Sequence, residues 1–207
     1  MNQSIRDHYG SLFQLHGDTH EAAQYSSRES QFRRFASLAR IGNLKDQRVL
    51  DYGCGTGCFA EYLHQINQQP SLYCGTDIVK EFLACAKQKW PQALFFDPSE
   101  LGDKRFDYAF VSGVFNNRRV NNRKFWQETV RDLFQRCDKG VAFNLMSTYV
   151  DYQAPDLFYE DPCRAFKFLK QEITPFVQLC HDYLVKEDSI AFEFTLFAYQ
   201  SAAQLRF

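Results

Sequence analysis

The chain has 207 residues, a formal net charge of -1 and 45% hydrophobic residues. This length predicts one domain with a sizeable core. The near-neutral charge argues against a nucleic-acid partner. We find no run of about 18 apolar residues, as a membrane span would need, and the polar start "MNQSIRDHYG" lacks the apolar region of a signal peptide. The default expectation is a cytoplasmic protein with no membrane partner.

The seven cysteines are scattered along the chain and include no C-x-x-C pair. Such spacing suits small buried side chains in a reducing compartment and does not suit a zinc site. The acidic residues singled out below form no evident metal cluster either. We therefore expect no bound metal.

The first part of the chain is polar and then helical. Residues 27–41, "SRESQFRRFASLARI", carry apolar side chains near helical spacing. We interpret residues 1–45 as an N-terminal helical cap or lid, and residues 46–207 as the main domain. Gln31 and Arg34 share one face of the helix and could reach a ligand, although a plain surface helix is the alternative.

Strands and helices alternate after this region. The pattern predicts strands at 48–53, 72–78, 93–97, 106–113 and 140–147, with helices at 57–68, 79–90 and 124–137. A helix at 161–173 follows, and then two strands at 177–185 and 191–200. Continuous apolar strands joined by amphipathic helices predict a parallel sheet covered on both faces. We expect an α/β, doubly wound, mostly parallel seven-stranded sheet with an antiparallel C-terminal hairpin.

Three glycines occupy every second position directly after the first strand, in the stretch "VLDYGCGTGCF" at residues 49–59. Gly53, Gly55 and Gly57 remove side chains from this turn, so that a ligand can approach the backbone. In open α/β sheets ligands bind at the carboxyl ends of the strands, and the next helix begins there with free amide donors. The turn therefore predicts a ligand site.

Acidic residues end three successive predicted strands, namely Asp51, Asp77 and Asp97. An acid at position 77 can accept hydrogen bonds from both hydroxyls of a ribose. Asp97 could accept from an exocyclic amine, with Phe96 and Ile78 beside the adenine ring. For each acid alone, a helix N-cap or a solvated loop position is the alternative.

The stretches "VLDYGCGTG", "GTDI" and "FFD" resemble the first three motifs of the Rossmann-like (class I) S-adenosylmethionine-dependent methyltransferases. The resemblance covers about residues 48–207 at the level of architecture, including the terminal hairpin. It implies S-adenosylmethionine as cofactor and S-adenosylhomocysteine as product. It also implies that Asp51 organises the loop and the methionine ammonium, that Asp77 holds the ribose and that Asp97 holds the adenine amine. The residues expected to contact the cofactor are Asp51, Gly53, Cys54, Gly55, Gly57, Asp77, Ile78, Phe96, Asp97, Ser112 and Gly113.

Two other classes of enzyme have related motifs. A nicotinamide dehydrogenase has G-x-G-x-x-G, whereas this chain has G-x-G-x-G preceded by Asp51. Radical S-adenosylmethionine enzymes use C-x-x-x-C-x-x-C. Cys54 and Cys58 match the first half of that motif, but Glu61 stands at the third position, so an iron–sulfur cluster cannot be ligated.

The segment after the fourth strand, "VSGVFNN", lies beside the methyl group by the same resemblance. We expect Phe115, Asn116, Arg118 and Tyr149 to contact the acceptor. Phe115 covering the core and a solvated loop around Arg118 are the alternatives. His181 and Tyr149 are weak candidates for a catalytic role, since a neutral histidine can act as a base, but a structural histidine is the alternative for His181.

The methyl group of a sulfonium is already activated, so catalysis is mainly alignment of an in-line attack. We expect methyl transfer to a small-molecule or glycan-like acceptor, because the Asn-Pro-Pro-Tyr type of motif of adenine and glutamine methyltransferases is missing. The stretches "SGVFNN", "AFNLMSTYVDY", "CHDY" and "EFTLFAYQ" resemble a bacterial branch of the superfamily and name no substrate. A non-catalytic S-adenosylmethionine-binding regulator and an RNA or protein methyltransferase remain open, as does the oligomeric state.

Overall fold

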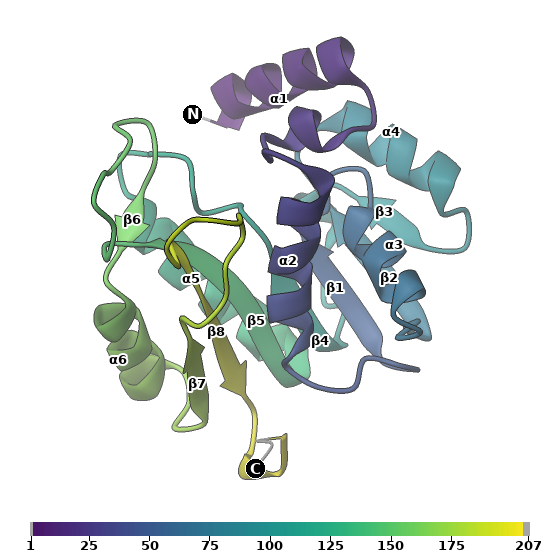
Figure 1. Cartoon of the computed structure of the whole chain (residues 1–207). Helices are drawn as coiled ribbons and strands as arrows, with labels where there is room; N and C mark the ends of the chain where they lie inside the picture. Colours follow the sequence, from purple (N-terminus) through teal and green to yellow (C-terminus); the bar gives the residue numbers. More distant parts are fainter. Residues whose placement is uncertain (1, 205–207) are drawn as a thin grey trace.

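A twisted, mostly parallel sheet forms the centre of the molecule, which we describe from a computed structural model covering residues 2–204 (Figure 1). The strands are β1 (Arg48–Tyr52), β2 (Leu72–Thr76), β3 (Leu94–Phe96), β4 (Phe106–Val111), β5 (Cys137–Ser147), β6 (Tyr159–Glu160), β7 (Val177–Cys180) and β8 (Glu193–Tyr199). Their order in the sheet is β3-β2-β1-β4-β5-β8-β7, and β6 pairs with β5. The pairs β5–β8 and β7–β8 are antiparallel and the others are parallel. The predicted fold class, with its C-terminal hairpin, is confirmed.

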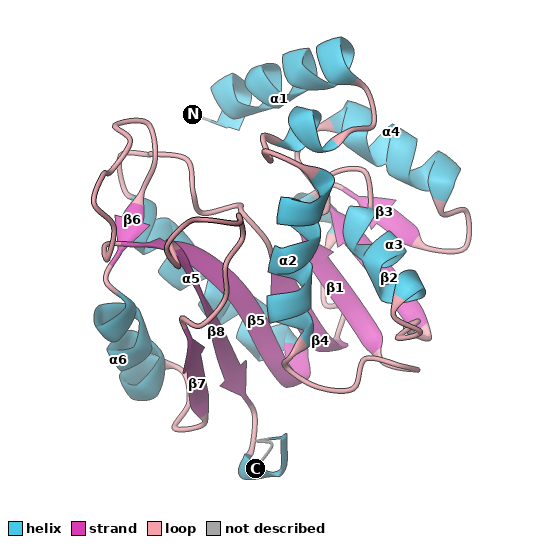
Figure 2. Cartoon of the chain, viewed as in Figure 1, coloured by secondary structure: helices cyan, strands magenta, loops and turns pink. Residues whose placement is uncertain are grey.

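Helices cover both faces of the sheet (Figure 2). They are α1 (Asn2–His16), α2 (Arg28–Ala39), α3 (Cys58–Gln65), α4 (Lys80–Lys89), α5 (Asn122–Arg136) and α6 (Pro162–Glu172), with short 3-10 helices η1 (His20–Ala23), η2 (Pro98–Glu100) and η3 (Ala202–Gln204). Side chains cap the starts of two of the α-helices: Ser27 Oγ accepts from Ser30 N at the start of α2, and Asp161 caps α6.

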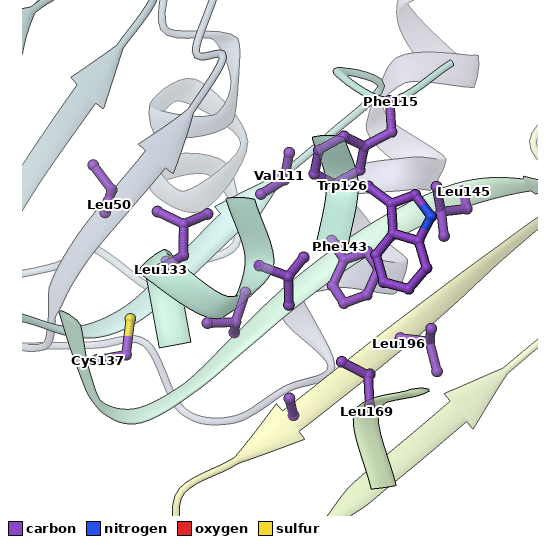
Figure 3. Packing of buried hydrophobic residues seen from close by; sticks show 14 of the residues in the cluster. Leu50, Val111, Phe115, Trp126, Leu133, Cys137, Phe143, Leu145, Leu169 and Leu196 are labelled. Atoms are coloured by element: carbon purple, nitrogen blue, oxygen red, sulfur yellow. The ribbon is translucent and has the colours of Figure 1, made fainter. Parts of the chain in front are cut away.

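Side chains of the sheet alternate between two apolar layers, as the pleat requires. On β4, Ala109 and Val111 belong to the layer under α5 and α6, whereas Tyr108 and Phe110 belong to the layer under α2, α3 and α4. Figure 3 shows the first layer, in which the indole of Trp126 stacks on Phe143 with 5.8 Å between the ring centroids. The rigid sheet therefore holds the ends of its strands in fixed positions.

The structure differs from the sequence prediction at several boundaries. It adds α1 and the two-residue strand β6, so that eight strands are present within residues 2–204. The strand predicted at 177–185 ends at Cys180, because Thr195 on β8 is its last partner. Asp182, beyond that end, turns away to pair with Arg40. Among the residues described, no helix is both long and apolar enough to cross a membrane.

Candidate cofactor and acceptor site

A cavity of about 560 Å³ lies where β1, β2 and β4 end at their carboxyl termini. Its wall is formed by the glycine turn after β1, the start of α2, residues 112–119 after β4, and the beginning of β8. Residues of α1, η1, α2 and the segments between them complete the lining. Its volume falls within the roughly 300–1,000 Å³ of typical small-ligand sites.

The three glycines of the turn have different surroundings. A Cβ added to Gly55 would meet no atom within 4 Å, and its φ is +54°. A Cβ on Gly53 would instead lie 2.2 Å from Val114 Cγ2, and one on Gly57 would lie 3.0 Å from Trp90. Gly55 is thus the position where the backbone faces open space in the cavity, while Gly53 and Gly57 permit close packing of the protein itself.

Asp77 follows β2 and lies beside this turn. Its Oδ2 accepts a hydrogen bond from Gly55 N at 2.9 Å, and its Oδ1 accepts from Val79 N at 2.9 Å. Burial raises the pKa of this carboxyl to about 6, although the backbone hydrogen bonds oppose the shift. The carboxylate lines the cavity with its orientation fixed by the backbone.

Asp51, at the end of β1, forms a second buried acid on the same wall. Burial raises its pKa to about 7, which the hydrogen bond from Tyr73 Oη at 2.5 Å partly opposes, and the charge of Asp77 adds to the rise. Two buried acids with raised pKa values favour a positively charged group of a ligand, because a nearby cation stabilises their ionised forms.

A buried network joins α2 to the end of β4. Arg34 Nη2 donates to Glu193 Oε1 at 2.6 Å, and the two side chains are 9% and 1% exposed. Asn144 Nδ2 donates to Glu193 Oε2 at 2.8 Å, while Asn144 Oδ1 accepts from Gly113 N at 2.9 Å. The backbone at Gly113 is therefore positioned by a chain of polar contacts that begins on α2.

Tyr25 lies over the loop after β4, beside Ser112. The sequence did not predict this residue as part of the site. Its Oη is 3.4 Å from Ser112 Oγ, and the guanidinium of Arg34 is 4.9 Å from its ring centroid. Burial raises the pKa of Tyr25 to about 12, so its hydroxyl keeps its proton at neutral pH. The residue stands in a polar stretch without periodicity, and no local pattern could have identified it.

Two side-chain contacts of α1 hold the N-terminal segment against the rest of the protein. Asn117 Nδ2 donates to Tyr9 Oη at 2.8 Å, which links α1 to the loop after β4. Arg6 pairs with Asp97 at 3.2 Å near the end of β3. Figure 1 shows α1 running beside α4, above the carboxyl ends of the strands.

The structure brings most of the predicted cofactor residues together. Those lining the cavity are Asp51, Gly53, Cys54, Gly55, Asp77, Ile78, Ser112 and Gly113, together with the predicted acceptor residue Asn116. Gln31 and Arg34 also line it and are buried, so α2 is no plain surface helix. The predicted residues outside the lining are Gly57, Phe96, Asp97, Phe115, Arg118, Tyr149 and His181.

Phe115 packs into the core, so the prediction that it contacts the acceptor is wrong. It is 1% exposed and meets the ring of Phe125 edge-on at 5.5 Å between centroids. Figure 3 shows it beside Val111 in the layer under α5. The chain turns at Gly113, where φ is +73°, and this turn directs Phe115 back onto the sheet.

Asp97 is not among the residues that line the cavity, and its carboxylate caps η2. Its Oδ1 accepts from Ser99 N at 3.0 Å and from Ser99 Oγ at 2.7 Å, and these bonds lower its pKa. Its Oδ2 is paired with Arg6, so both oxygens of the carboxylate already accept hydrogen bonds from the protein. Phe96 next to it packs beneath Lys104.

The remaining predicted side chains lie on the rim or beyond it. His181 Nε2 donates to Ala191 O at 2.7 Å, as a structural histidine does. Tyr149 is 61% exposed and stands 6.2 Å from His181 between ring centroids. Arg118 is exposed, while Arg119 next to it lines the cavity.

The polar groups of the site are suited to an organic ligand. Within residues 2–204, no group of three or more His, Cys, Asp or Glu side chains is placed to hold a metal ion. The open backbone at Gly55 and the oriented carboxylate of Asp77 match the requirements of an adenosyl group, which needs close backbone approach and an acceptor for its ribose hydroxyls.

Comparisons with known proteins agree with this geometry. Residues 50–135 match the family described as a methyltransferase domain. The chain is 30% identical over 161 residues to "Putative methyltransferase Rv1506c" of Mycobacterium tuberculosis. The matched region covers 73% of this chain and 96% of the relative.

Solved structures share the fold at low sequence identity. The magnesium protoporphyrin IX methyltransferase of Synechocystis PCC 6803 with bound S-adenosylhomocysteine has a TM-score of 0.69 at 17% identity, over 97% of this chain and 100% of that one. The small RNA methyltransferase HEN1 has a TM-score of 0.60 at 16% identity, over 84% of this chain and 25% of that one. The chain therefore belongs to the class I S-adenosylmethionine-dependent methyltransferases, enzymes that use S-adenosylmethionine as cofactor and release S-adenosylhomocysteine.

Proposed function

We propose that this methyltransferase acts on a small-molecule acceptor that enters the cavity. The observation that carries the proposal is the cover over the ends of β1 and β4. Tyr25 reaches Ser112 from one direction, and Tyr9 reaches Asn117 from another. Such a cover favours an acceptor that can diffuse into the cavity over an internal atom of a folded RNA or protein.

For the cofactor, the proposal assigns binding to the glycine turn and the two buried acids. Gly55 presents open backbone, and Asp77 accepts hydrogen bonds from the ribose hydroxyls. Asp51 stabilises the ammonium of the methionine part through its negative charge. When bound, S-adenosylmethionine supplies a methyl group activated by the positive sulfonium.

For the acceptor, the proposal assigns the wall next to Ser112 and Gly113. Met146 and Phe192 line this part of the cavity with apolar surface and exclude water. The protonated hydroxyl of Tyr25 can donate a hydrogen bond that orients the acceptor. Alignment of this kind is the main contribution that a protein makes to an in-line transfer.

The basic stretch after β4 gives little support to a nucleic-acid acceptor. Arg123 pairs with Glu160 at 2.7 Å, and Lys124 lies 3.8 Å from Glu128. These two cations of the stretch thus have acidic partners, which reduce the positive potential available to a phosphate backbone.

We further infer that the lid of the enzyme consists of α1 and η1, while α2 belongs to the core. Phe35 and Leu38 of α2 are buried in the layer that also contains α3. By contrast, α1 is fastened mainly by side-chain contacts such as Tyr9–Phe82 and Phe13–Phe82.

The test follows a labelled methyl group. S-adenosylmethionine with a labelled methyl is incubated with the enzyme and with separated small-molecule, RNA and protein fractions of bacterial cells. We expect label to appear in the small-molecule fraction, and Asp77→Ala to reduce it when S-adenosylmethionine is not saturating. Label that appears in the RNA or protein fraction alone would overturn the small-molecule proposal.

A further inference from the structure

Arg119 lines the cavity as a half-buried cation without an acidic partner. Its guanidinium carbon is 4.1 Å from the ring centroid of Phe125, and its Nε is buried with no hydrogen-bond partner. Burial lowers the pKa of Arg119, and the groups that oppose this shift are the hydroxyls of Tyr52 and Tyr9. Within the described part of the chain, no carboxylate forms an ion pair with it.

The other arginine that lines the cavity among the residues described, Arg34, has an acidic partner in Glu193. A buried charge without a partner lowers stability, because the protein replaces water without supplying an opposite charge. The folded protein nevertheless holds the Arg119 guanidinium at the cavity without an acidic partner. This is expected if the acidic partner is supplied by a bound ligand.

Asn116 adds a second unsatisfied group to the same wall. Its Oδ1 is buried without a hydrogen-bond partner, and the residue belongs to the same loop as Arg119. A carboxamide can accept from an O–H or N–H group. The loop after β4 thus presents an unpaired guanidinium and an unpaired carboxamide to the cavity.

We propose that Arg119 and Asn116 form a subsite for an acidic group, a carboxylate or a phosphate, on the methyl acceptor. The guanidinium binds the anion, and the carboxamide accepts from a hydroxyl or amine close to it. The proposal rests on the small-molecule function proposed above and narrows its substrate class to acids. The apolar neighbours Phe125 and Leu157 suit the hydrocarbon part of such a molecule.

Two further charged residues, Asp156 and Lys186, line the cavity. Among the residues described, neither forms an ion pair with Arg119. Asp156 opposes the binding of an anion by like-charge repulsion. Asp156→Asn should therefore strengthen anion binding, whereas loss of Arg119 should weaken it.

The cofactor carries a carboxylate as well. The experiment must therefore show whether Arg119 binds the carboxylate of the cofactor or an acidic group on the acceptor. Calorimetric titrations with S-adenosylhomocysteine and with 5′-methylthioadenosine, which lacks the amino-acid part, compare wild type with Arg119→Gln. We expect the variant to bind both within twofold of wild type. A tenfold loss confined to S-adenosylhomocysteine would assign Arg119 to the cofactor and overturn the acceptor subsite.

The subsite itself is probed with inorganic phosphate and with acetate, at constant ionic strength, on protein saturated with S-adenosylhomocysteine. We expect Arg119→Gln to weaken binding of the anions at least tenfold. Arg118→Gln is the matched control, because it removes the same charge from the adjacent, exposed position, and should stay within twofold. Equal binding by wild type and Arg119→Gln, or no binding by either, would overturn the proposal.

An activity measurement separates this inference from the proposed function. Small hydroxy and amino acids are compared with their methyl esters as acceptors of labelled methyl. We expect the acids to be preferred by wild type and Arg119→Gln to lose the preference. Should only RNA or protein become labelled while Arg119-dependent phosphate binding persists, the proposed function fails and the anion subsite stands.

Discussion

The carboxylate of Asp77 accepts a hydrogen bond from the backbone amide of Gly55, with 2.9 Å between Oδ2 and N. The bond connects the end of β2 to the turn after β1. It holds the two parts of the proposed cofactor site in one arrangement before any ligand arrives. A preformed site of this kind loses little conformational freedom on binding.

Removal of the Asp77 carboxylate should weaken binding of the cofactor product. We expect Asp77→Ala to lower the affinity for S-adenosylhomocysteine by about 1–3 kcal/mol, because the ribose hydroxyls lose their acceptor. Calorimetric titration measures the change. Asp97→Ala is the control, since Asp97 caps η2 and does not line the cavity. An equal loss in both variants would contradict the assignment.

The glycines of the turn should respond differently to alanine. In Gly55→Ala the new Cβ points into open space, so affinity for S-adenosylhomocysteine should fall much more than thermal stability. In Gly57→Ala the Cβ meets Trp90, so stability should fall by a larger amount. A strained φ above zero is common to both variants and costs about 1–3 kcal/mol in each. Thermal melts and titrations with S-adenosylhomocysteine compare the two variants. Equal losses of affinity and of stability in both would contradict the different roles given to Gly55 and Gly57.

The two buried acids should make the ligand-free protein less stable as pH rises. The pKa values of Asp51 and Asp77 are raised from 3.8 to about 7 and about 6. The folded state therefore holds these protons more tightly than the unfolded state. Their stabilising contribution is complete below pH 3.8 and is lost as pH rises through 6 and 7.

Urea unfolding across this pH window tests the prediction. Asp51→Asn should flatten the decline of the free energy of unfolding, because an amide does not titrate. Asp103→Asn, at an exposed position, serves as the control and should keep the wild-type slope. A slope that is unchanged in Asp51→Asn would show that another group is responsible.

The ion pair between Arg34 and Glu193 should be important for stability. Both side chains are buried, so Glu193→Gln leaves an uncompensated guanidinium and should cost about 3–5 kcal/mol of unfolding free energy. Chemical denaturation measures this loss. Glu187→Gln removes an exposed partner of Arg33 and should leave the unfolding curve in place. Comparable curves for the two variants would rule out the role given to the buried pair.

The hydrogen bond between Tyr9 and Asn117 should affect ligand release. Tyr9→Phe removes the hydroxyl that receives the Asn117 amide, and so loosens α1 over the cavity. We expect S-adenosylhomocysteine to dissociate several times faster, with little change in thermal stability. Stopped-flow fluorescence follows the dissociation. Asp18→Asn loosens the contact with Lys89 away from the cavity and serves as the comparison.

Sequence reasoning succeeded where local chemistry and strand ends coincide. The glycine turn and Asp77 are marked by spacing alone, and parallel strands bring their carboxyl ends to one edge of the sheet. Ser112 and Gly113 were predicted from the family resemblance, and both line the same cavity. The mostly parallel sheet and its C-terminal hairpin followed from apolar strands and amphipathic helices, although the two-residue β6 carries too little pattern to be predicted.

The errors arose where one residue type suits two environments. Asp97 fits both a ligand contact and an N-cap, and the Ser99 amide decided in favour of the cap. Phe115 follows a turn whose direction depends on Gly113 and on the position of α5. Arg34 and Glu193 are 159 positions apart, and no local pattern relates them.

The path from Arg34 through Glu193 and Asn144 to the Gly113 amide has a consequence for enzyme engineering. Chimaeras that exchange only the first 45 residues for those of a relative would separate partners that lie on three different elements. Glu193 on β8 would then be buried without its partner, unless the new segment also carried an arginine at the position of Arg34. Segment swaps that aim at new acceptors must therefore treat α2, β5 and β8 as one inherited unit.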